Sequence, residues 1–475
     1  LNLNSRFSEH NDHRYGGTVG FNAGKFNSLT NVQYNNVDTY GVDNPGDFST
    51  VFGSRVWNFK ERLIYHPLET LKLTARAGYY FRERNKPGDT QDRYRDFNGG
   101  LKANYTFNTL SNLEVGYTFD QYDKSDYQVL YKNDVRDYSN VQHNVHALYN
   151  YTFNEKHTLT VGADYLRDYL MSYQFTDNAN YIMHTADAFG QFDWNPTERL
   201  NVIAGLRFDY FSDSNVRHLS PHLGMMYKIG NCSLRGSYSQ GFRSPTLKEM
   251  YMVFNMANMM MIYGNPDLKS ETSHNFSLSA EYTKNRYNFS VTGYYNLVHN
   301  RINTVYSDDP KGQIYTNTDK VDIAGVDANI SAKYPCGLGF RMSYTYIHEF
   351  MRDGQKKFTD TRPHTATVRV DWGENLDKVD FNYSLNGRIL SEVKTNVYND
   401  SFNNPAAGST AVTYPGYMIW DLTFSVGVFK GVNMNLAINN LFNYVPDYYY
   451  FNSPTTTGAN LTLGLSLDID RFFKK

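Results

Sequence analysis

Residues 459–470 read ANLTLGLSLDID, and apolar and polar side chains alternate along this stretch without a break. The positions between the apolar ones carry Thr, Gly, Ser and Asp, and the apolar positions themselves are Leu461, Leu463, Leu465, Leu467 and Ile469. Because successive side chains of a β-strand point to opposite faces, this pattern predicts a strand with one apolar face and one polar face.

The same alternation recurs along the whole chain of 475 residues. It is clear in residues 71–80, 158–165, 201–210, 275–282, 325–334 and 420–428. No window approaches about 18 consecutive apolar residues, so the sequence predicts no transmembrane helix. Aromatic residues make up 16% of the chain, with 41 tyrosines, and the mean hydropathy is −0.59. A soluble antiparallel sheet would alternate in the same way, so the connections must decide between water and membrane.

The connections between these segments alternate between short and long. Short ones lie at 154–156, 195–199, 230–232 and 336–338, and long ones lie near 36–57, 85–97, 249–271, 306–319 and 398–416. Transmembrane β-barrels show this asymmetry, with short periplasmic turns and long extracellular loops. A closed barrel also satisfies its backbone hydrogen-bonding groups within lipid, and aromatic residues at strand ends form interfacial girdles. The sequence therefore predicts an all-β fold, a 22-stranded antiparallel transmembrane β-barrel over residues 1–475.

The predicted strands cover the chain almost from Leu1. They begin near residues 1, 15, 29, 58, 71, 98, 112, 141, 158, 184, 200, 219, 233, 272, 287, 321, 339, 364, 379, 417, 432 and 459. A barrel of this width encloses a lumen that needs a plug, and no segment of the sequence suits that role. We expect a plug domain upstream of Leu1, and an open pore is the alternative.

Three motifs resemble those of one family of bacterial receptors. GFRSP (241–245) followed by GNPDLKSE (264–271) resembles a pair of boxes that flank one outer loop, INNLFN (438–443) resembles the signature of the penultimate strand, and GLSLDI (464–469) lies at the place of the last strand. Over its whole length the chain is similar to the barrel of TonB-dependent outer-membrane receptors. The positions that match the two boxes are Phe242, Arg243, Ser244, Pro245, Asn265, Pro266, Asp267 and Leu268.

This resemblance implies active import of a scarce, bulky ligand across the outer membrane of a Gram-negative bacterium. A plug and a TonB box upstream would couple the barrel to the TonB–ExbB–ExbD complex. Outer-membrane lipids would surround the barrel, and a surface lipoprotein or a haemophore is a further expected partner. The resemblance implies no enzyme, and the sequence has no C-x-x-C, H-E-x-x-H or nucleophile-elbow motif. A net charge of −2 gives no indication of nucleic-acid binding.

The two boxes favour haem or haemin as the transported ligand, since they resemble the FRAP and NPNL boxes of haem receptors. Ser244 stands where alanine is usual, and no histidine lies between Pro245 and Gly264, where many haem receptors have one. Cobalamin or another corrinoid and a ferric siderophore are therefore alternatives, and a passive porin or docking barrel is a different class of function. Haem would be a transported ligand and not a permanently bound cofactor, and the sequence assigns no metal site.

Six of the 14 methionines lie within residues 250–261, in the predicted seventh outer loop. Thioether side chains adapt to flat apolar surfaces such as a porphyrin face, and their sulfur can also bind haem iron or Cu(I). Packing of the loop against a plug, a neighbouring loop or a partner lipoprotein would use the same residue type. The candidate ligand-binding residues in this loop are Met252, Met256, Met259, Met260, Met261 and Tyr263.

Histidines are the other candidate haem ligands. His10 and His13 lie in the predicted first outer loop, where they are either ligands or solvated loop residues. The histidines near other predicted outer strand ends are His184, His218, His299 and His364. His348 shares a strand face with aromatic residues and is expected in the outer lipid girdle.

Several charged residues are expected to line the lumen. Arg243 is in phase with Arg235, Ser237 and Ser239, and it could hold a carboxylate of a loop or plug, or meet a haem propionate. The other charges predicted on the lumen face, for hydrogen bonds to a plug, are Arg207, Asp209, Asp327 and Lys333. Cys232 and Cys336 map to periplasmic turns several strands apart, so no disulfide is predicted between them.

Overall fold

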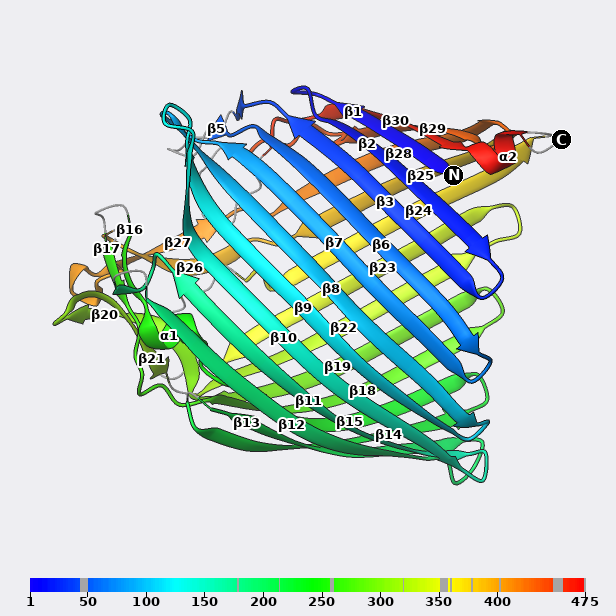
Figure 1. Cartoon of the computed structure of the whole chain (residues 1–475), viewed down its shortest axis with the longest axis horizontal. Coiled ribbons are helices and arrows are strands. Elements are labelled where there is room, and N and C mark those ends of the chain that lie inside the picture. The colour runs from blue at the N-terminus through cyan, green and yellow to red at the C-terminus, as the bar shows by residue number, and fades with distance from the viewer. Residues whose placement is uncertain are drawn as a thin grey trace.

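The alternating stretch at the C-terminus forms strand β30 (Asn460–Asp468), which closes a barrel by pairing with β1 (Asn2–Ser8) in the computed structural model. The structure describes residues 1–475 except 43–49, 177–178, 213, 257–259, 319, 351–357, 359–360, 377–378, 401–402, 447–455 and 474–475. In the part that it describes, 22 wall strands pair with their neighbours along the chain, each antiparallel to the next (Figure 1). The predicted fold class is confirmed.

The wall strands follow one another without a crossover. Besides β1 and β30 they are β2 (His13–Ala23), β3 (Phe26–Val37), β6 (Ser54–Leu68), β7 (Leu71–Asn85), β8 (Thr90–Asn108), β9 (Ser111–Gln128), β10 (Asn133–Phe153), β11 (His157–Ser172), β12 (Asn180–Trp194), β13 (Leu200–Phe211), β14 (Val216–Ile229), β15 (Cys232–Arg243), β18 (Glu271–Lys284), β19 (Tyr287–His299), β22 (Val321–Lys333), β23 (Leu338–Phe350), β24 (His364–Leu376), β25 (Val379–Leu390), β28 (Tyr417–Phe429) and β29 (Val432–Asn439). The elements outside the wall are β4 (Tyr40–Gly41), β5 (Thr50–Val51), α1 (Leu247–Tyr251), β16 (Val253–Met256), β17 (Met260–Tyr263), β20 (Arg301–Asp308), β21 (Lys311–Thr318), β26 (Val393–Tyr398), η2 (Pro405–Ala407), β27 (Ser409–Tyr414) and α2 (Ile469–Phe473).

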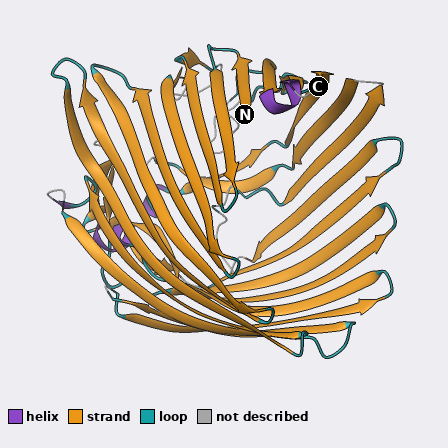
Figure 2. Ribbon diagram, turned by 45° about the vertical axis from the view of Figure 1, so that its right-hand side comes forward, coloured by secondary structure: helices purple, strands orange, loops and turns teal. Residues whose placement is uncertain are grey.

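The two ends of the barrel differ, as the sequence predicts. At one end the wall strands are joined by turns as short as 24–25 and 230–231, and we call this the short-turn end. Gly230 has a φ of 57° and Asn285 a φ of 52°, the left-handed conformation that tight hairpin turns require. At the other end, the long-loop end, connections such as 244–270 and 391–416 carry strands of their own. Both chain termini lie at the short-turn end (Figure 1), and the helices among the described residues lie near the two ends of the barrel (Figure 2).

Cross-strand partners show that the apolar residues share one face of the wall. Leu463 is opposite Phe7 on β1 and Leu436 on β29, and this pattern continues around the barrel. Large apolar side chains on this face are open, with Leu278 74% and Leu101 64% exposed. In water such a surface would be unfavourable, but it suits the lipid-facing side of a membrane barrel, whose lumen side is polar. Among the residues that the structure describes, no helix is long and apolar enough to span a membrane.

The long connection predicted near residues 85–97 is wrong. Strand β7 runs to Asn85 and β8 begins at Thr90, so only 86–89 remain as a connection, and β10 likewise begins at Asn133, well before the predicted start. These extensions carry charges on both faces, with Arg84 paired to Asp92 on one face and Arg93 paired to Glu83 on the other. Because both faces of these extensions meet water beyond the membrane, the apolar–polar alternation that reveals a strand is missing there.

The seventh and eighth loops join in a small sheet outside the wall. Its strand order is β16-β17-β21-β20, and β17 from loop seven pairs in parallel with β21 from loop eight. The sheet stands at the long-loop end beside α1 (Figure 1). Both cysteines are free, as predicted, with Cys232 at the start of β15 and Cys336 in the turn before β23.

Candidate ligand site at the long-loop end

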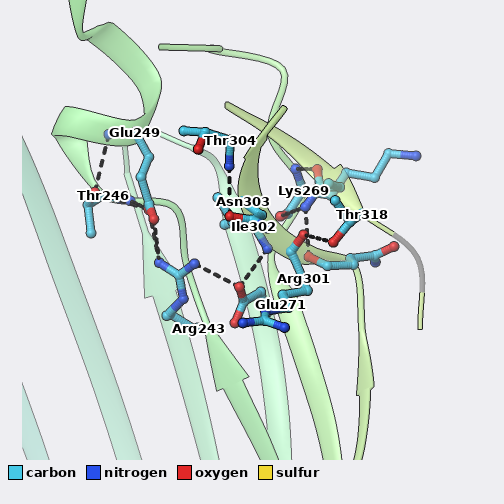
Figure 3. A network of polar contacts seen from close by, with 12 residues as sticks. Arg243, Thr246, Glu249, Lys269, Glu271, Arg301, Ile302, Asn303, Thr304 and Thr318 are labelled. Carbon is cyan, nitrogen blue, oxygen red and sulfur yellow. Dashed lines mark hydrogen bonds and ion pairs between the residues drawn. The ribbon is translucent and has the colours of Figure 1, made fainter. Parts of the chain in front are cut away.

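Arg243, the last residue of β15, ties three segments together at the long-loop end (Figure 3). Its Nη1 donates to both carboxylate oxygens of Glu249 at 2.9 Å, and its Nη2 donates to Oε1 of Glu271 at 2.8 Å. The same oxygen of Glu271 accepts the backbone N–H of Ile302 at 2.6 Å. Arg243 therefore fastens α1, β18 and β20 to one point, and its guanidinium holds carboxylates of the protein itself.

Helix α1 is built from a capping box and an apolar face. Thr246 Oγ1 accepts the Glu249 N–H at 3.3 Å, and Glu249 Oε2 accepts the Thr246 N–H at 2.8 Å, so two free donors at the helix start are satisfied. Leu247 and Met250 are each 2% exposed and pack with Leu170 of β11. The helix is therefore docked onto the wall instead of standing free in the loop.

The second box, residues 265–268, braces loop seven against loop eight. Asn265 Nδ2 donates to the Tyr315 carbonyl at 3.1 Å, and its Oδ1 accepts the Asp267 N–H at 2.9 Å. Leu268 is 6% exposed. A Cβ at Gly264 would lie 2.5 Å from the Met252 backbone nitrogen, so only glycine fits this approach of two chain segments.

The residues of the first box, 241–245, are also closely packed. The Phe242 ring stacks on His218 with centroids 4.2 Å apart, and Ser244 Oγ lies 3.1 Å from Ser214 Oγ in the sixth loop. Pro245 is less than 2% exposed. These contacts make both boxes anchors of loop seven.

The structure divides the methionine run into packed and open residues. Met252 is 7% exposed, and its carbonyl accepts the Gly264 N–H. Met256 is 36% exposed at the end of β16, and Met260 and Met261 are half-buried in β17. Tyr263, also half-buried in β17, is the register partner of Val253, and Met259 lies outside the described residues. Among the described methionines of the run, Met256, Met260 and Met261 thus keep solvent-exposed surface.

The structure does not bring His10 and His13 to the methionine loop. His10 stacks on Tyr40 with centroids 4.0 Å apart, and His13 Nδ1 lies 3.2 Å from Asn11 Oδ1. Ten wall strands separate β2 from β15 in one direction and eight separate β18 from β1 in the other, so the two groups lie on opposite sides of the barrel. In the described ranges, no three or more His, Cys, Asp or Glu side chains are arranged to hold a metal ion.

A patch of aromatic and cationic side chains lines the lumen beside α1, and the sequence analysis did not single it out. Arg82, Tyr94, Lys124 and Tyr138 are successive cross-strand partners on β7, β8, β9 and β10. Tyr122, one step nearer the short-turn end, lies with its ring centroid 6.4 Å from that of Tyr94 and 6.0 Å from that of Tyr138. From α1, Lys248 Nζ lies 4.8 Å from the Tyr138 centroid. We call Arg82, Tyr94, Tyr122, Lys124, Tyr138 and Lys248 the aromatic–cationic wall.

Two cations of the aromatic–cationic wall lack an anionic partner in the described part of the chain. Lys124 Nζ lies 3.0 Å from Asp137 and 3.7 Å from Asp92, whereas Arg82 and Lys248 make no ion pair. Burial lowers the pKa of Lys248, since desolvation disfavours its charged form. An anion placed here would find two uncompensated positive charges beside tyrosine faces.

Further negative charge is present in the lumen nearer the short-turn end. Asp96, the cross-strand partner of Tyr80 and Tyr122, is one row below the cations and accepts a hydrogen bond from Asn98. Arg207 pairs with Asp187 at 2.9 Å and with Asp209 at 2.8 Å on the lumen face. Hydrogen bonds from such lumen charges to a plug stay a prediction.

A protein family and several individual proteins are similar to this chain in sequence. A family model described as "TonB dependent receptor-like, beta-barrel" matches residues 10–441. The iron-regulated outer membrane virulence protein of Vibrio cholerae serotype O1 is 24% identical over 297 residues, which are 58% of this chain and 43% of that protein. The heme/hemopexin utilization protein C of Haemophilus influenzae strain 86-028NP is 22% identical over 335 residues, which are 59% of this chain and 44% of that protein. The chain thus spans less than half the length of these curated relatives.

Solved structures share the whole barrel. The siderophore receptor PirA from Acinetobacter baumannii superposes with a TM-score of 0.79 at 16% identity, covering 98% of this chain and 80% of that one. The copper transporter OprC superposes with a TM-score of 0.77 at 13% identity, covering 98% and 79%. At such identities the likeness establishes the fold alone. With the family model covering nearly all of the wall, the chain belongs to the β-barrel family of TonB-dependent receptors, and its place is the bacterial outer membrane.

Proposed function

We propose that this barrel is the pore of a TonB-dependent importer for an anionic iron complex with aromatic faces, and that haem is its ligand. The observation that carries the proposal is the aromatic–cationic wall at the extracellular mouth. Arg82 and Lys248 offer positive charge that no described residue pairs, and Tyr94, Tyr122 and Tyr138 offer ring faces within the same patch. A porphyrin with two propionates matches this combination of charge and flat apolar surface.

The methionines of loop seven would complete the ligand contacts. Met256, Met260 and Met261 are the described members of the run that are not deeply buried, and their thioethers suit a porphyrin face or an axial position on the iron. Met259 belongs to the same proposal by sequence alone. Because Arg243 holds loop seven against the wall, the methionines of this loop would contact the ligand from a fixed position.

Transport would follow the mechanism of TonB-dependent receptors. A ligand captured at the mouth would pass to the apex of a plug inside the lumen, and the TonB–ExbB–ExbD complex would pull on that plug to open a path. The barrel would do no covalent chemistry. A surface lipoprotein or haemophore that delivers the ligand would dock on the long loops.

A ferric siderophore with catecholate groups is the second candidate ligand. The same wall favours it, because such a complex is also anionic and presents aromatic rings. A corrinoid or Cu(I) remains a further alternative, and neither needs the unpaired cations. A passive porin or docking barrel would show no ligand-specific binding.

The experiment is a visible-absorption titration of the full-length receptor with haemin. We expect saturable binding in the wild type, and Arg82→Gln and Lys248→Gln should each weaken it about tenfold, as expected for loss of one charged hydrogen bond. Replacing Met256, Met260 and Met261 together by Leu keeps apolar volume but removes sulfur, so a changed Soret band would assign ligation to a thioether. Arg341→Gln removes a lumen-facing cation elsewhere and should have no effect. Equal binding by all variants would refute the proposed site.

A further inference from the structure

Seven of the 13 histidines form a belt on the outer face of the barrel. Their cross-strand partners place them in register with the apolar, lipid-facing residues. His13, His143, His184, His274 and His348 lie ten residues from the short-turn end of their strands, and His299 and His364 lie twelve residues from it. Ten residues of a strand tilted by about 40° rise about 25 Å, which matches the height of the apolar band of such barrels. The belt therefore lies where the outer leaflet meets its headgroups.

Four of these histidines share one local arrangement. A tyrosine hydroxyl meets the histidine Nδ1 in each of the pairs Tyr117–His143 at 2.8 Å, Tyr165–His184 at 2.7 Å, Tyr238–His274 at 2.9 Å and Tyr344–His364 at 2.7 Å. A tyrosine that donates to Nδ1 fixes the tautomer with the proton on Nε2, at the opposite edge of the ring. Each such imidazole thus keeps a donor for a group outside the protein.

One sector of the belt holds a cation that nothing in the described chain neutralises. Arg167 on β11 is directly opposite His143 on β10 and His184 on β12. Its side chain makes no hydrogen bond, ion pair or ring contact with any residue that the structure describes. Directly opposed side chains on one sheet face lie about 5 Å apart, so three nitrogen donors converge on this strip of the outer surface.

No carboxylate in the described part of the chain neutralises the positive charge of Arg167. Asp168 points to the lumen, where it accepts hydrogen bonds from Asn140 and Gln142. On the outer face Asp123 is the nearest acid in register, and it is engaged by Gln121 at 2.9 Å and Arg136 at 3.6 Å. An unpaired arginine at the edge of the apolar band calls for an external anion.

The surface beside this strip is suited to acyl chains. An apolar groove crosses strands β3 to β10, and Leu101, Val115, Tyr117 and Val145 line the part of it that lies on β8, β9 and β10. Val145 and Tyr117 lie on the membrane side of His143, and strands β9 to β12 lie side by side in the wall (Figure 1). Anion donors at the headgroup level and an apolar groove below them match an amphiphile that carries a phosphate.

We propose that His143, Arg167 and His184 form a binding site for the phosphate of an outer-leaflet lipid, whose acyl chains lie in the adjoining groove. Tyr117 and Tyr165 orient the two imidazoles. The site is independent of the imported ligand, since it lies on the opposite face of the wall from the lumen.

The test is native mass spectrometry of the full-length receptor in detergent, titrated with bisphosphorylated lipid A or with the same lipid A after dephosphorylation. All variants are first checked for a folded barrel by their resistance to unfolding in SDS at room temperature. The wild type should bind the phosphorylated lipid about tenfold more tightly than the dephosphorylated one. Arg167→Gln should abolish this preference, and His143→Phe with His184→Phe should reduce it. Arg341→Gln, which removes a lumen-facing cation, should leave it unchanged.

The second part of the test uses inorganic phosphate as a competitor of the lipid. At millimolar concentration it should not displace the lipid, because the groove contributes much of the binding. Full displacement would assign a free-anion site and overturn the lipid assignment. Equal preference in the wild type and Arg167→Gln, or an equal loss in Arg341→Gln, would overturn the site itself.

Discussion

Removal of the Arg243 side chain should release loop seven from the barrel. Arg243→Ala deletes the hydrogen bonds to Glu249 and Glu271 and leaves two carboxylates, 15% and 19% exposed, without their cation. Hydrogen bonds to charged groups contribute about 1.5–3 kcal/mol each, but Arg243 is 40% exposed and screening reduces this value. We therefore expect the local opening free energy of α1 and the β20 start to fall by about 2 kcal/mol.

Hydrogen-exchange mass spectrometry measures this opening directly. A loss of about 2 kcal/mol corresponds to about 30-fold faster exchange in peptides that cover 247–256 and 301–306. Wall strands such as β24 should exchange at the wild-type rate. Arg235→Ala is the matched control, because it breaks a similar ion pair, to Glu281 at 2.8 Å, near the short-turn end. Unchanged exchange in loop seven, or a uniform rise over the whole barrel, would refute the role assigned to Arg243.

Three further substitutions test the same region. Gly264→Ala should expose loop seven to protease, because its Cβ would lie 2.5 Å from the Met252 nitrogen, and normal protease resistance would contradict this. Thr246→Ala should lower the opening free energy of α1 by about 1 kcal/mol through loss of the capping box, and hydrogen exchange limited to α1 should report it. Lys248→Met should raise the melting temperature at neutral pH while weakening haemin binding. Burial lowers the pKa of Lys248 in the folded state, so the unfolded chain binds its proton more strongly and the gain should shrink as pH rises through that pKa. A melting temperature that falls at neutral pH would exclude this explanation.

The wall of the barrel could be predicted from sequence because each of its faces meets one environment. Leu278 on the outer face and Ser277 on the lumen face follow the rule of lipid outside and polar lumen inside. The rule fails above the membrane, where both faces are wet. For this reason the sequence of the β8 extension to Thr90 carries no strand pattern and predicts a loop.

The candidate sites depend on the register between neighbouring strands, which the sequence of a single strand does not reveal. Arg82 and Tyr138 are far apart in the chain, and they join one lumenal row only through the pairing of β7 to β10. Tyr94 and Tyr122 break the polar pattern of the lumen face, and that departure is the signal that could have identified the patch. The sequence predicts only that Arg243 could bind a carboxylate. It does not identify Glu249 and Glu271, because α1 and the return of loop seven to the wall bring these residues to Arg243.

Ranking ligands on one preparation shows whether the mouth of this barrel receives an anionic aromatic iron complex. Full-length receptor would be titrated with haemin, a ferric catecholate and cyanocobalamin, with intrinsic tyrosine and tryptophan fluorescence as the common readout. We expect haemin to bind most tightly and the ferric catecholate second, and we expect Arg82→Gln to weaken the binding of both. Tightest binding of cyanocobalamin, with an affinity unaffected by Arg82→Gln, would contradict this expectation.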